Sequence, residues 1–216
     1  MIWVSYMVMV GIAYLLGSIP TGYLVGWTKG IDIRKIGSGN IGATNVFRSL
    51  GKTSGIIVLG IDALKGYAAC RWAAPLVYSW LMAPGQADLA ARQKLALAAG
   101  IAAVLGHTFC CWLQFKGGKG IATTGGAFAA LAPSAVLTTL SIWILALAVT
   151  RYVSVASITA AIVLPVTVWF WGGSLEMVVI TAVIGLLAIY KHRMNVRRLV
   201  HGTEPRFGTK MSKPVS

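Results

Sequence analysis

Acidic side chains are scarce in this 216-residue chain. Asp and Glu number 5 against 19 Lys and Arg, which gives a formal net charge of +14. Cysteine is rare too, and Cys70, Cys110 and Cys111 show neither a CxxC spacing nor a Cys/His ligand spacing. We therefore expect no metal site and interpret the cysteines as packing residues.

Charged residues of both signs make up only 11% of the chain, whereas 57% is hydrophobic and the mean hydropathy is +0.76. This composition predicts an all-α polytopic membrane protein. The N-terminal apolar run lacks a preceding basic segment and is long enough to span, so we expect no cleavable signal peptide. The positive charge then reflects the positive-inside rule, anionic lipids and an anionic substrate, and we expect no nucleic-acid partner.

Apolar runs predict about seven transmembrane helices in a single domain covering residues 1–216, with the N-terminus outside and the C-terminus cytoplasmic. We place the spans at the following residues: 2–25, 54–78, 94–112, two pieces within 121–150, 154–171 and 177–190. A break near Pro133 keeps every basic cluster inside. The first piece is then only roughly 20 Å long, which is short for a bilayer, so the preceding loop should dip into the membrane. Pro84 and Gly85 mark an outer loop.

The first polar cluster is the sequence IGSGNIGATNVFR at residues 36–48. Glycines let backbone N–H groups converge on an anion, and Arg48 can add a bidentate grip. The candidate binding residues here are Gly37, Ser38, Gly39, Asn40, Gly42, Thr44, Asn45 and Arg48. The spacing also satisfies GxGxxG, but the membrane-length flanks argue against a dinucleotide fold. A flexible connector remains the alternative.

The second polar cluster is FKGGKGIATT at residues 115–124, where Gly117, Gly118 and Gly120 flank Lys119. It resembles a P-loop, but neither Ser nor Thr follows the lysine and no strand precedes it. We interpret it as a second anion site with a lysine point charge; the alternative is a basic cytoplasmic turn.

The third cluster lies in the basic tail at residues 191–207, where His192 and Asn195 share one helix face. The alternative there is a juxtamembrane helix on anionic lipid. Within the second span, Asp62 and Lys65 are one turn apart and are expected to form a structural ion pair. His107 has no carboxylate nearby in sequence, so we expect a packed or capping histidine.

The three clusters are expected to form cytoplasmic loops at residues 28–53, 114–124 and 191–207, with no carboxylate among their functional groups. Such a set of residues is suited to binding phosphate groups. It is also suited to a reaction whose donor is already activated, because positioning of the substrates and electrostatic stabilisation then account for most of the rate enhancement.

Three motifs carry a resemblance to a known family. They are GSGNIGATNVFR at residues 37–48, GHTFCCWLQFKGGKGIAT at 106–123 and HRMNVRRLVHGTEPR at 192–206. In this order they resemble the bacterial membrane glycerol-3-phosphate acyltransferases that use acyl phosphate as donor, the PlsY family. The resemblance covers nearly the whole chain. It implies a seven-helix bundle in the bacterial inner membrane with an active site facing the cytoplasm.

The reaction implied by this resemblance is acyl transfer from acyl phosphate to the sn-1 hydroxyl of glycerol 3-phosphate. It gives 1-acyl-sn-glycerol 3-phosphate (lysophosphatidate) and phosphate, the first acyl transfer of phospholipid synthesis. The family needs no acyl-CoA, acyl carrier protein, metal or other cofactor. We expect a monomer whose acyl donor lies between helices, open to the membrane lipids.

In the implied site, Ser38, Arg48, Lys119 and the glycine-loop N–H groups hold phosphate, and Ser157 adds a contact. His192 and Asn195 orient the reacting groups. The proton leaves to His192 or to a substrate phosphate oxygen, and we favour the phosphate because no carboxylate accompanies His192 in the sequence. Glu204 is expected to tie down the tail. The alternative function is a transporter of an organic phosphate ester, which predicts polar residues across the whole bundle.

Overall fold

The computed structural model describes residues 2–81 and 88–208, and every regular element in these ranges is a helix. The elements are α1 (Ile2–Gly17), α2 (Thr21–Trp27), η1 (Ile33–Lys35), α3 (Ala43–Leu50), α4 (Lys52–Ala68), the π-helical turn η2 (Ala69–Ala73), α5 (Ala74–Leu81), α6 (Leu89–Thr108), η3 (Cys111–Leu113), α7 (Ile121–Leu131), α8 (Pro133–Thr150), α9 (Val153–Phe170), α10 (Leu175–Lys191) and α11 (Arg193–Val200). The predicted all-α class is confirmed. The outer-loop residues Pro84 and Gly85 fall outside the described residues.

Five described segments are long and apolar enough to cross a membrane. They are Tyr6–Trp27, Lys52–Trp80, Leu89–Leu113, Pro133–Thr150 and Val153–Phe170. The pair α10–α11, bent by 52°, makes a sixth if it is counted as one span, and α7 is a shorter apolar helix. The break near Pro133 is confirmed, since α7 ends at Leu131 and α8 begins at Pro133. The count of seven spans and the orientation of the termini stay predictions.

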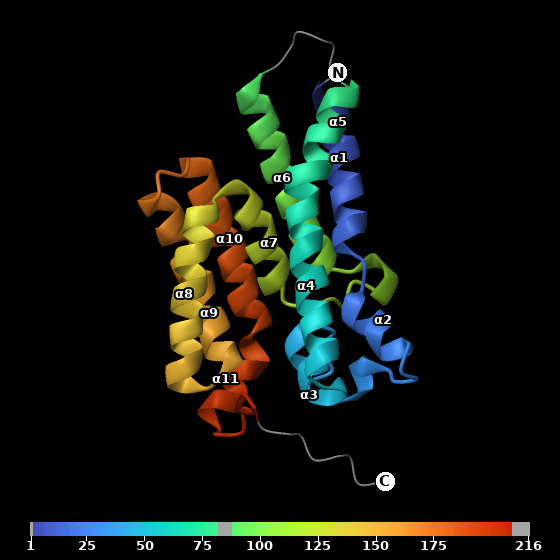
Figure 1. Ribbon diagram of the computed structural model, residues 1–216, viewed down its shortest axis with the longest axis vertical. Helices are drawn as coiled ribbons and strands as arrows, with labels where there is room; N and C mark the ends of the chain where they lie inside the picture. The colour runs from blue at the N-terminus through green and yellow to red at the C-terminus, as the bar shows by residue number, and fades with distance from the viewer. Residues whose placement is uncertain (1, 82–87, 209–216) are drawn as a thin grey trace.

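The helices form two groups joined by α7 (Figure 1). Helices α8, α9 and α10 pack side by side in one group, α1, α4, α5 and α6 form the other, and α7 packs against α4, α6 and α8. Helices α3 and α11 lie at the same end of the molecule, opposite the end where α1 begins. The segments that carry the first and third clusters are therefore at one end, and the loop before α7 lies deeper in the molecule.

Reciprocal glycines allow two of these helix pairs to approach closely. A Cβ on Gly17 of α1 would lie 2.1 Å from the Ala103 carbonyl oxygen of α6, and one on Gly106 of α6 would lie 2.1 Å from that of Tyr14. Helices α4 and α7 meet in the same way, through a glycine on each. Small residues are the usual means of packing helices in a membrane, where close backbone approach replaces the hydrophobic effect.

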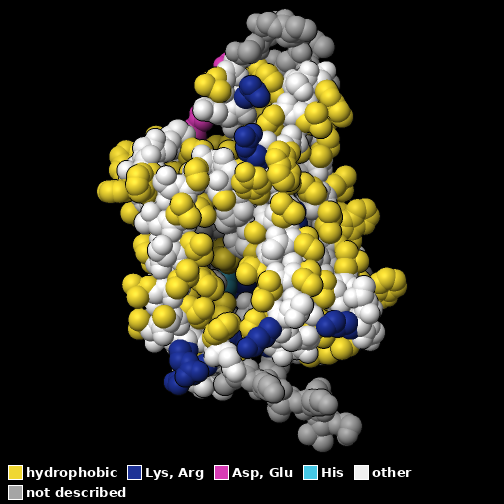
Figure 2. All heavy atoms as spheres, viewed as in Figure 1, with side chains coloured by type: hydrophobic (Ala, Val, Ile, Leu, Met, Phe, Trp, Pro, Cys, Tyr) yellow, Lys and Arg dark blue, Asp and Glu magenta, His cyan; other side chains and the backbone are white. Residues whose placement is uncertain are grey.

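The outward surface of the bundle is strongly apolar. Trp3, Val149 and Phe170 are each more than 75% exposed, as suits side chains in contact with lipid. Figure 2 shows hydrophobic side chains over the middle of the face, with basic side chains gathered at the end that holds α3 and α11 and a smaller basic group at the other end. A hollow opens between the two groups of helices, and a histidine is visible inside it.

Candidate active site

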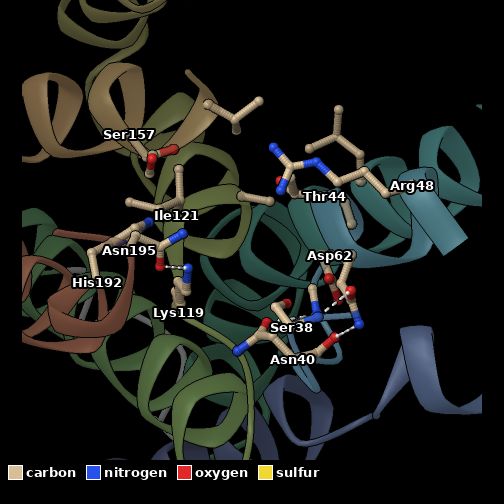
Figure 3. Close-up of a pocket in the computed structure, with 18 of the residues that line it drawn as sticks. Ser38, Asn40, Thr44, Arg48, Asp62, Lys119, Ile121, Ser157, His192 and Asn195 are labelled. Atoms are coloured by element: carbon tan, nitrogen blue, oxygen red, sulfur yellow. Dashed lines mark hydrogen bonds between the residues drawn. The ribbon is translucent and has the colours of Figure 1, made fainter. Parts of the chain in front are cut away.

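A polar cavity of about 120 Å³ brings the three clusters together. The predicted residues that line it are Ser38, Asn40, Gly42, Thr44, Asn45, Arg48, Lys119, Gly120, Ser157, His192 and Asn195. Figure 3 shows two facing walls: Ser38, Asn40, Thr44 and Arg48 on one side, and Lys119, Ser157, His192 and Asn195 on the other. The predicted residues Gly37, Gly39, Gly117 and Gly118 are not among those that line the cavity.

Asn45 holds the first glycine loop in shape. Its Nδ2 donates to the carbonyl oxygens of Ile33, Ile36 and Asn40 at 2.9–3.2 Å, and its Oδ1 accepts from the N–H of Ser38 at 3.0 Å. Both the amide oxygen and the amide nitrogen are thus engaged within the loop. Asn45 lines the cavity, and its side chain also builds the wall that presents Ser38; its predicted contact with a ligand stays a prediction.

Several N–H groups of the first glycine loop already have partners within the loop, so they are not free to bind an anion in this structure. The N–H of Gly39 donates to Ile36, and that of Gly42 donates to the side chain of Asn40. Gly37 and Gly39 adopt φ values of 62° and 69°, and these turns close the loop on itself. The N–H groups of Gly39 and Gly42 therefore stabilise the loop itself.

The second loop is equally self-contained. The N–H groups of Gly117 and Gly118 donate to the carbonyl oxygens of Thr108 and His107. A Cβ on Gly118 would lie 2.0 Å from His107 Nε2, so this glycine is needed for close packing on the imidazole. Gly120, with φ of 83°, ends the loop where α7 begins. The N–H groups of Gly117 and Gly118 are thus used within the protein, and the loop brings Lys119 and Gly120 to the cavity.

Some backbone donors remain available at the first wall. Residues Ala43 and Thr44 begin α3 and line the cavity, and N–H groups in a first helical turn have no intrahelical partner. Arg48 lies one turn later in the same helix, and its Nη2 donates to the carbonyl oxygen of Pro205 at 2.9 Å. Burial lowers the pKa of Arg48, yet its usual value is so high that the guanidinium stays charged. The first wall therefore combines donors with a fixed positive charge.

Lys119 supplies the charge of the second wall. Its Nζ donates to Asn195 Oδ1. Burial lowers the pKa of Lys119 to about 8; the carboxylate of Glu204 opposes this effect, while Arg198 and Arg48 add to it. The ammonium is thus charged at neutral pH and poorly solvated, which strengthens its attraction for an anion.

His192 lies at the bend between α10 and α11 and is buried. Its Nδ1 donates to the Ala188 carbonyl oxygen at 2.7 Å, because a carbonyl can only accept. In the neutral imidazole this bond leaves Nε2 unprotonated. His192 can therefore accept a hydrogen bond or a proton through Nε2.

Glu204 lines the polar cavity, so the expectation that no carboxylate joins the three clusters is wrong. Its Oε1 accepts from Asn195 Nδ2 at 2.7 Å and from Ser154 Oγ at 2.8 Å, and its Oε2 accepts from Arg198 Nε at 2.7 Å. Burial would raise the pKa of Glu204, but these hydrogen bonds outweigh burial and lower it. The ionised carboxylate ties the tail to α9 and α11, in agreement with the structural role predicted for it.

An apolar cavity of about 340 Å³ adjoins the polar one. Leu59, Ile121, Ala122 and Trp143 line both cavities, so the two meet at these side chains. Trp143 Nε1 donates to Ser157 Oγ at 3.4 Å at this junction. A charged group and a long apolar chain can thus occupy neighbouring spaces.

Comparison with known proteins identifies the family. The family model described as glycerol-3-phosphate acyltransferase matches residues 7–202. A glycerol-3-phosphate acyltransferase of Trichlorobacter lovleyi is 46% identical over 195 residues, which cover 90% of this chain and 94% of the relative. A glycerol-3-phosphate acyltransferase of a Synechococcus species is 44% identical over 201 residues, which cover 93% of this chain and 94% of the relative.

The chain belongs to the glycerol-3-phosphate acyltransferase family.

Crystal structures of PlsY, described as an integral membrane glycerol 3-phosphate acyltransferase, agree with this assignment. The glycerol 3-phosphate form has a TM-score of 0.82 and is 40% identical, covering 95% of this chain and 96% of that protein. The lysophosphatidic acid form has a TM-score of 0.79 with the same identity and coverage. The predicted PlsY family membership and the predicted integral membrane fold are thus confirmed.

Two residues that the sequence did not indicate as site residues also line the polar cavity. Asp62 and His107 line it, with His107 Nδ1 3.6 Å from Asp62 Oδ1. The predicted ion pair of Asp62 with Lys65 is confirmed at 2.9 Å. The expectation for His107 rested on sequence neighbours, and it missed a carboxylate that α4 brings to α6.

Proposed function

We propose that the protein transfers the acyl group of an acyl phosphate to the sn-1 hydroxyl of glycerol 3-phosphate, releasing 1-acyl-sn-glycerol 3-phosphate and phosphate. Membership of the glycerol-3-phosphate acyltransferase family supports the acceptor and the type of reaction. The choice of donor rests on the chemistry of the two cavities and on the resemblance of the motifs to the PlsY family.

The observation that carries the proposal is the junction of the polar cavity with the apolar one at Leu59, Ile121, Ala122 and Trp143. An acyl phosphate has a charged head and a long apolar tail, and the two spaces match these parts. The scissile carbonyl would then lie at the junction, between the phosphate-binding side chains and the chain-binding helices.

Two phosphate groups must be held at once, one on each substrate. The cavity offers two cations on facing walls, Arg48 and Lys119, with hydroxyl groups nearby at Ser38, Thr44 and Ser157. Arg48 suits bidentate binding of a phosphate, and Lys119 suits a point contact. We assign one phosphate to each wall, which leaves the reacting carbonyl and hydroxyl between the walls.

In the reaction the sn-1 hydroxyl oxygen bonds to the carbonyl carbon, and the bond from that carbon to the phosphate oxygen breaks. The hydroxyl proton passes to a phosphate oxygen or to His192 Nε2, and inorganic phosphate leaves. We still favour the phosphate, because Nδ1 of His192 donates to a backbone carbonyl and the described residues include no carboxylate hydrogen-bonded to its imidazole. Asn195, engaged with both Lys119 and Glu204, orients the ammonium toward the charge that develops.

We further propose that the protein works as a monomer in the bacterial inner membrane, with this cavity facing the cytoplasm. The gathering of basic side chains at the cavity end agrees with the positive-inside rule.

The test is product formation by the purified protein in lipid with palmitoyl phosphate and glycerol 3-phosphate. We expect phosphate release and lysophosphatidate only when both substrates are present, and no product with palmitoyl-CoA or palmitoyl acyl carrier protein. Turnover with a thioester donor but not with acyl phosphate would contradict the donor assignment. If neither donor reacts, uptake of labelled glycerol 3-phosphate by proteoliposomes tests the transporter instead.

A further inference from the structure

Helix α7 is much shorter than the neighbouring helix α6, and this difference leaves an open space between the two groups of helices. Helix α7 has 11 residues and α6 has 20, and α6 continues past the end of α7 toward the end of the molecule where α1 begins (Figure 1). A groove of about 1180 Å³ lies there, beside α6 and between the α7–α8 turn and the loop that joins α9 to α10. Among the described residues, this α6–α10 groove shares no lining residue with the polar cavity or with the apolar cavity beside it.

The α6–α10 groove opens at a depth where the protein surface is apolar. Helix α1 packs against α5 and α6 and begins at the same end of the molecule (Figure 1). Trp3 and Met7 of α1 are 78% and 68% exposed, as suits side chains in contact with lipid. Trp171 lines the groove itself and is exposed, and tryptophan is enriched where the acyl chains of a bilayer meet the headgroups. The groove therefore opens toward lipid, near the level of the headgroups.

Apolar side chains line the part of the groove next to α7. Ala130, Leu131 and Ala132 lie where α7 ends, and Leu97 of α6 and Met177 of α10 face the same space. All five belong to one hydrophobic core cluster or pack against it. An ordered water molecule needs two to four polar partners, and these side chains offer none. The acyl chains of a lipid suit this part of the groove better than water does.

The groove also carries an excess of positive charge. Three basic residues line it, Arg71, Arg92 and Lys94, against one acidic residue, Glu176. Lys94 pairs with Glu176 at 3.5 Å. The excess charge is therefore that of Arg71 and Arg92, and it is complementary to an anionic group.

Arg71 lies within an apolar span, where a charge is costly unless it has a partner. It belongs to the π-helical turn η2, inside the candidate membrane span Lys52–Trp80. No carboxylate of residues 2–81 and 88–208 forms an ion pair with it. The phosphate of a lipid headgroup at the mouth of the groove would supply the missing negative charge.

We infer that the α6–α10 groove binds one anionic phospholipid, whose phosphate contacts Arg71 and Arg92 and whose acyl chains lie on the apolar surface at the end of α7. Basic pockets between transmembrane helices are typical binding sites for anionic headgroups. A free phosphate ion would leave the apolar surface uncovered, and a zwitterionic phospholipid lacks the net negative charge that balances the two arginines. The bound lipid bridges the two groups of helices beyond the end of α7 and stabilises the bundle. The inference does not rest on the proposed function.

The experiment measures the binding of phosphatidylglycerol and of phosphatidylcholine with identical acyl chains to the purified protein in detergent. Native mass spectrometry counts the lipids that each chain retains, and thermal denaturation reports the stabilisation. The main variant combines Arg71→Gln with Arg92→Gln. It removes the excess charge of the groove and leaves the pair of Lys94 with Glu176 intact.

Two further variants separate the contributions of charge and of apolar surface. The combination of Lys35→Gln with Lys52→Gln is the matched control, because it makes the same change of charge at exposed positions that line neither the groove nor the polar cavity. Ala130→Phe places a larger side chain in the apolar part of the groove and keeps every charge.

We expect the wild type and the lysine control to bind one phosphatidylglycerol per chain, about 25-fold more tightly than phosphatidylcholine, since each basic side chain near a headgroup contributes about fivefold. In the arginine double variant this preference should fall to within about threefold. Ala130→Phe should weaken the binding of both lipids by about tenfold, because their chains lose burial, and should keep the preference. Phosphatidylglycerol should raise the denaturation temperature of the wild type, and inorganic phosphate at the same concentration should not.

Equal retention of phosphatidylglycerol by the wild type and the arginine double variant would overturn the inference, as would equal binding of the two lipids by the wild type. A loss in the lysine control as large as that in the arginine variant would show attraction by net charge alone. Protection by inorganic phosphate that depends on the two arginines would assign the groove to a free anion. A wild-type dimer that Ala130→Phe dissociates would assign it to a second copy of the chain. Should the arginine variant not fold, unchanged lipid binding by Ala130→Phe overturns the inference instead.

Discussion

Lys119 Nζ donates a hydrogen bond to Asn195 Oδ1, although the two residues lie 76 positions apart in the chain. Asn195 in turn donates from Nδ2 to Glu204, so its amide orientation is fixed by a lysine that can only donate and an ionised carboxylate that can only accept. The chain of contacts couples the second polar cluster to the third and sets the direction of the ammonium from α11.

Replacing either cation should nearly abolish turnover. Arg48→Ala or Lys119→Ala removes a preorganised charge from a desolvated site, and we expect kcat/KM to fall by about 10²–10³-fold. Arg48→Lys should recover only part of this loss, because an ammonium cannot bind a phosphate in a bidentate manner. Phosphate release with acyl phosphate and glycerol 3-phosphate measures the effect. Near-normal activity of either alanine variant would contradict the phosphate-binding assignment.

The pKa of Lys119 predicts an alkaline limit to activity. Its value of about 8 means that the ammonium is present below this pH and is lost as the pH rises through it. We therefore expect kcat/KM for glycerol 3-phosphate to decline above about pH 8, while the phosphate itself stays dianionic above its own pKa of about 6. Lys119→Arg should move the decline to higher pH, whatever its effect on the maximal rate. A decline at the same pH in this variant would assign the titration to another group.

Removing the Glu204 carboxylate should destabilise the fold. Glu204→Ala leaves three donors, on Ser154, Asn195 and Arg198, without their acceptor in a buried site, and we expect a loss of about 2–4 kcal/mol. Thermal denaturation in detergent measures this loss. Glu176→Ala is the control, because that carboxylate forms an exposed ion pair with Lys94 at 3.5 Å and should matter little. Equal stability of the two variants would contradict the role given to Glu204.

Filling the apolar cavity should shorten the accepted acyl chain. Gly125 of α7 lines this cavity, and a Cβ there would meet nothing within 4 Å, so Gly125→Leu places its side chain in the open space without forcing the helices apart. We expect activity with palmitoyl phosphate to fall by about tenfold or more and activity with a short-chain acyl phosphate to change little, since each excluded methylene loses about 0.8 kcal/mol of burial.

Gly60→Leu is the matched control for this substitution. Gly60 also has open space around its Cβ position, but it lies in α4 and lines neither cavity. Its replacement should leave the chain-length profile unchanged. The same profile in both variants would show that the apolar cavity does not bind the acyl chain.

Features that depend on local sequence were predicted well. The break before Pro133 follows from the missing N–H of proline and from the balance of basic loops, and the structure places it there. The Asp62–Lys65 pair follows from helical spacing alone. The three clusters, residues of which line one cavity, could also be singled out, because glycine-rich polar runs stand out against an apolar background.

Features that depend on tertiary contacts were missed or misassigned. The loop N–H groups looked available, yet the internal partners of Gly39 and Gly118 are visible only in the folded loops. The role of the Asn45 amide in closing the loop is likewise visible only in the fold, because nothing in its spacing reveals it. The contact of His107 with Asp62 joins α6 to α4, and no local pattern announces such a pairing.

The bond from Arg48 Nη2 to the Pro205 carbonyl has a consequence for biosynthesis. Residues made early in translation complete their contacts only when the tail of the chain arrives, and His192, Asn195 and Glu204 are made late as well. A nascent chain that has inserted α1 to α9 already holds Arg48 and Lys119 but lacks the groups that orient them. We therefore expect the cavity to be completed only when the segment that carries His192, Asn195 and Glu204 has been synthesised.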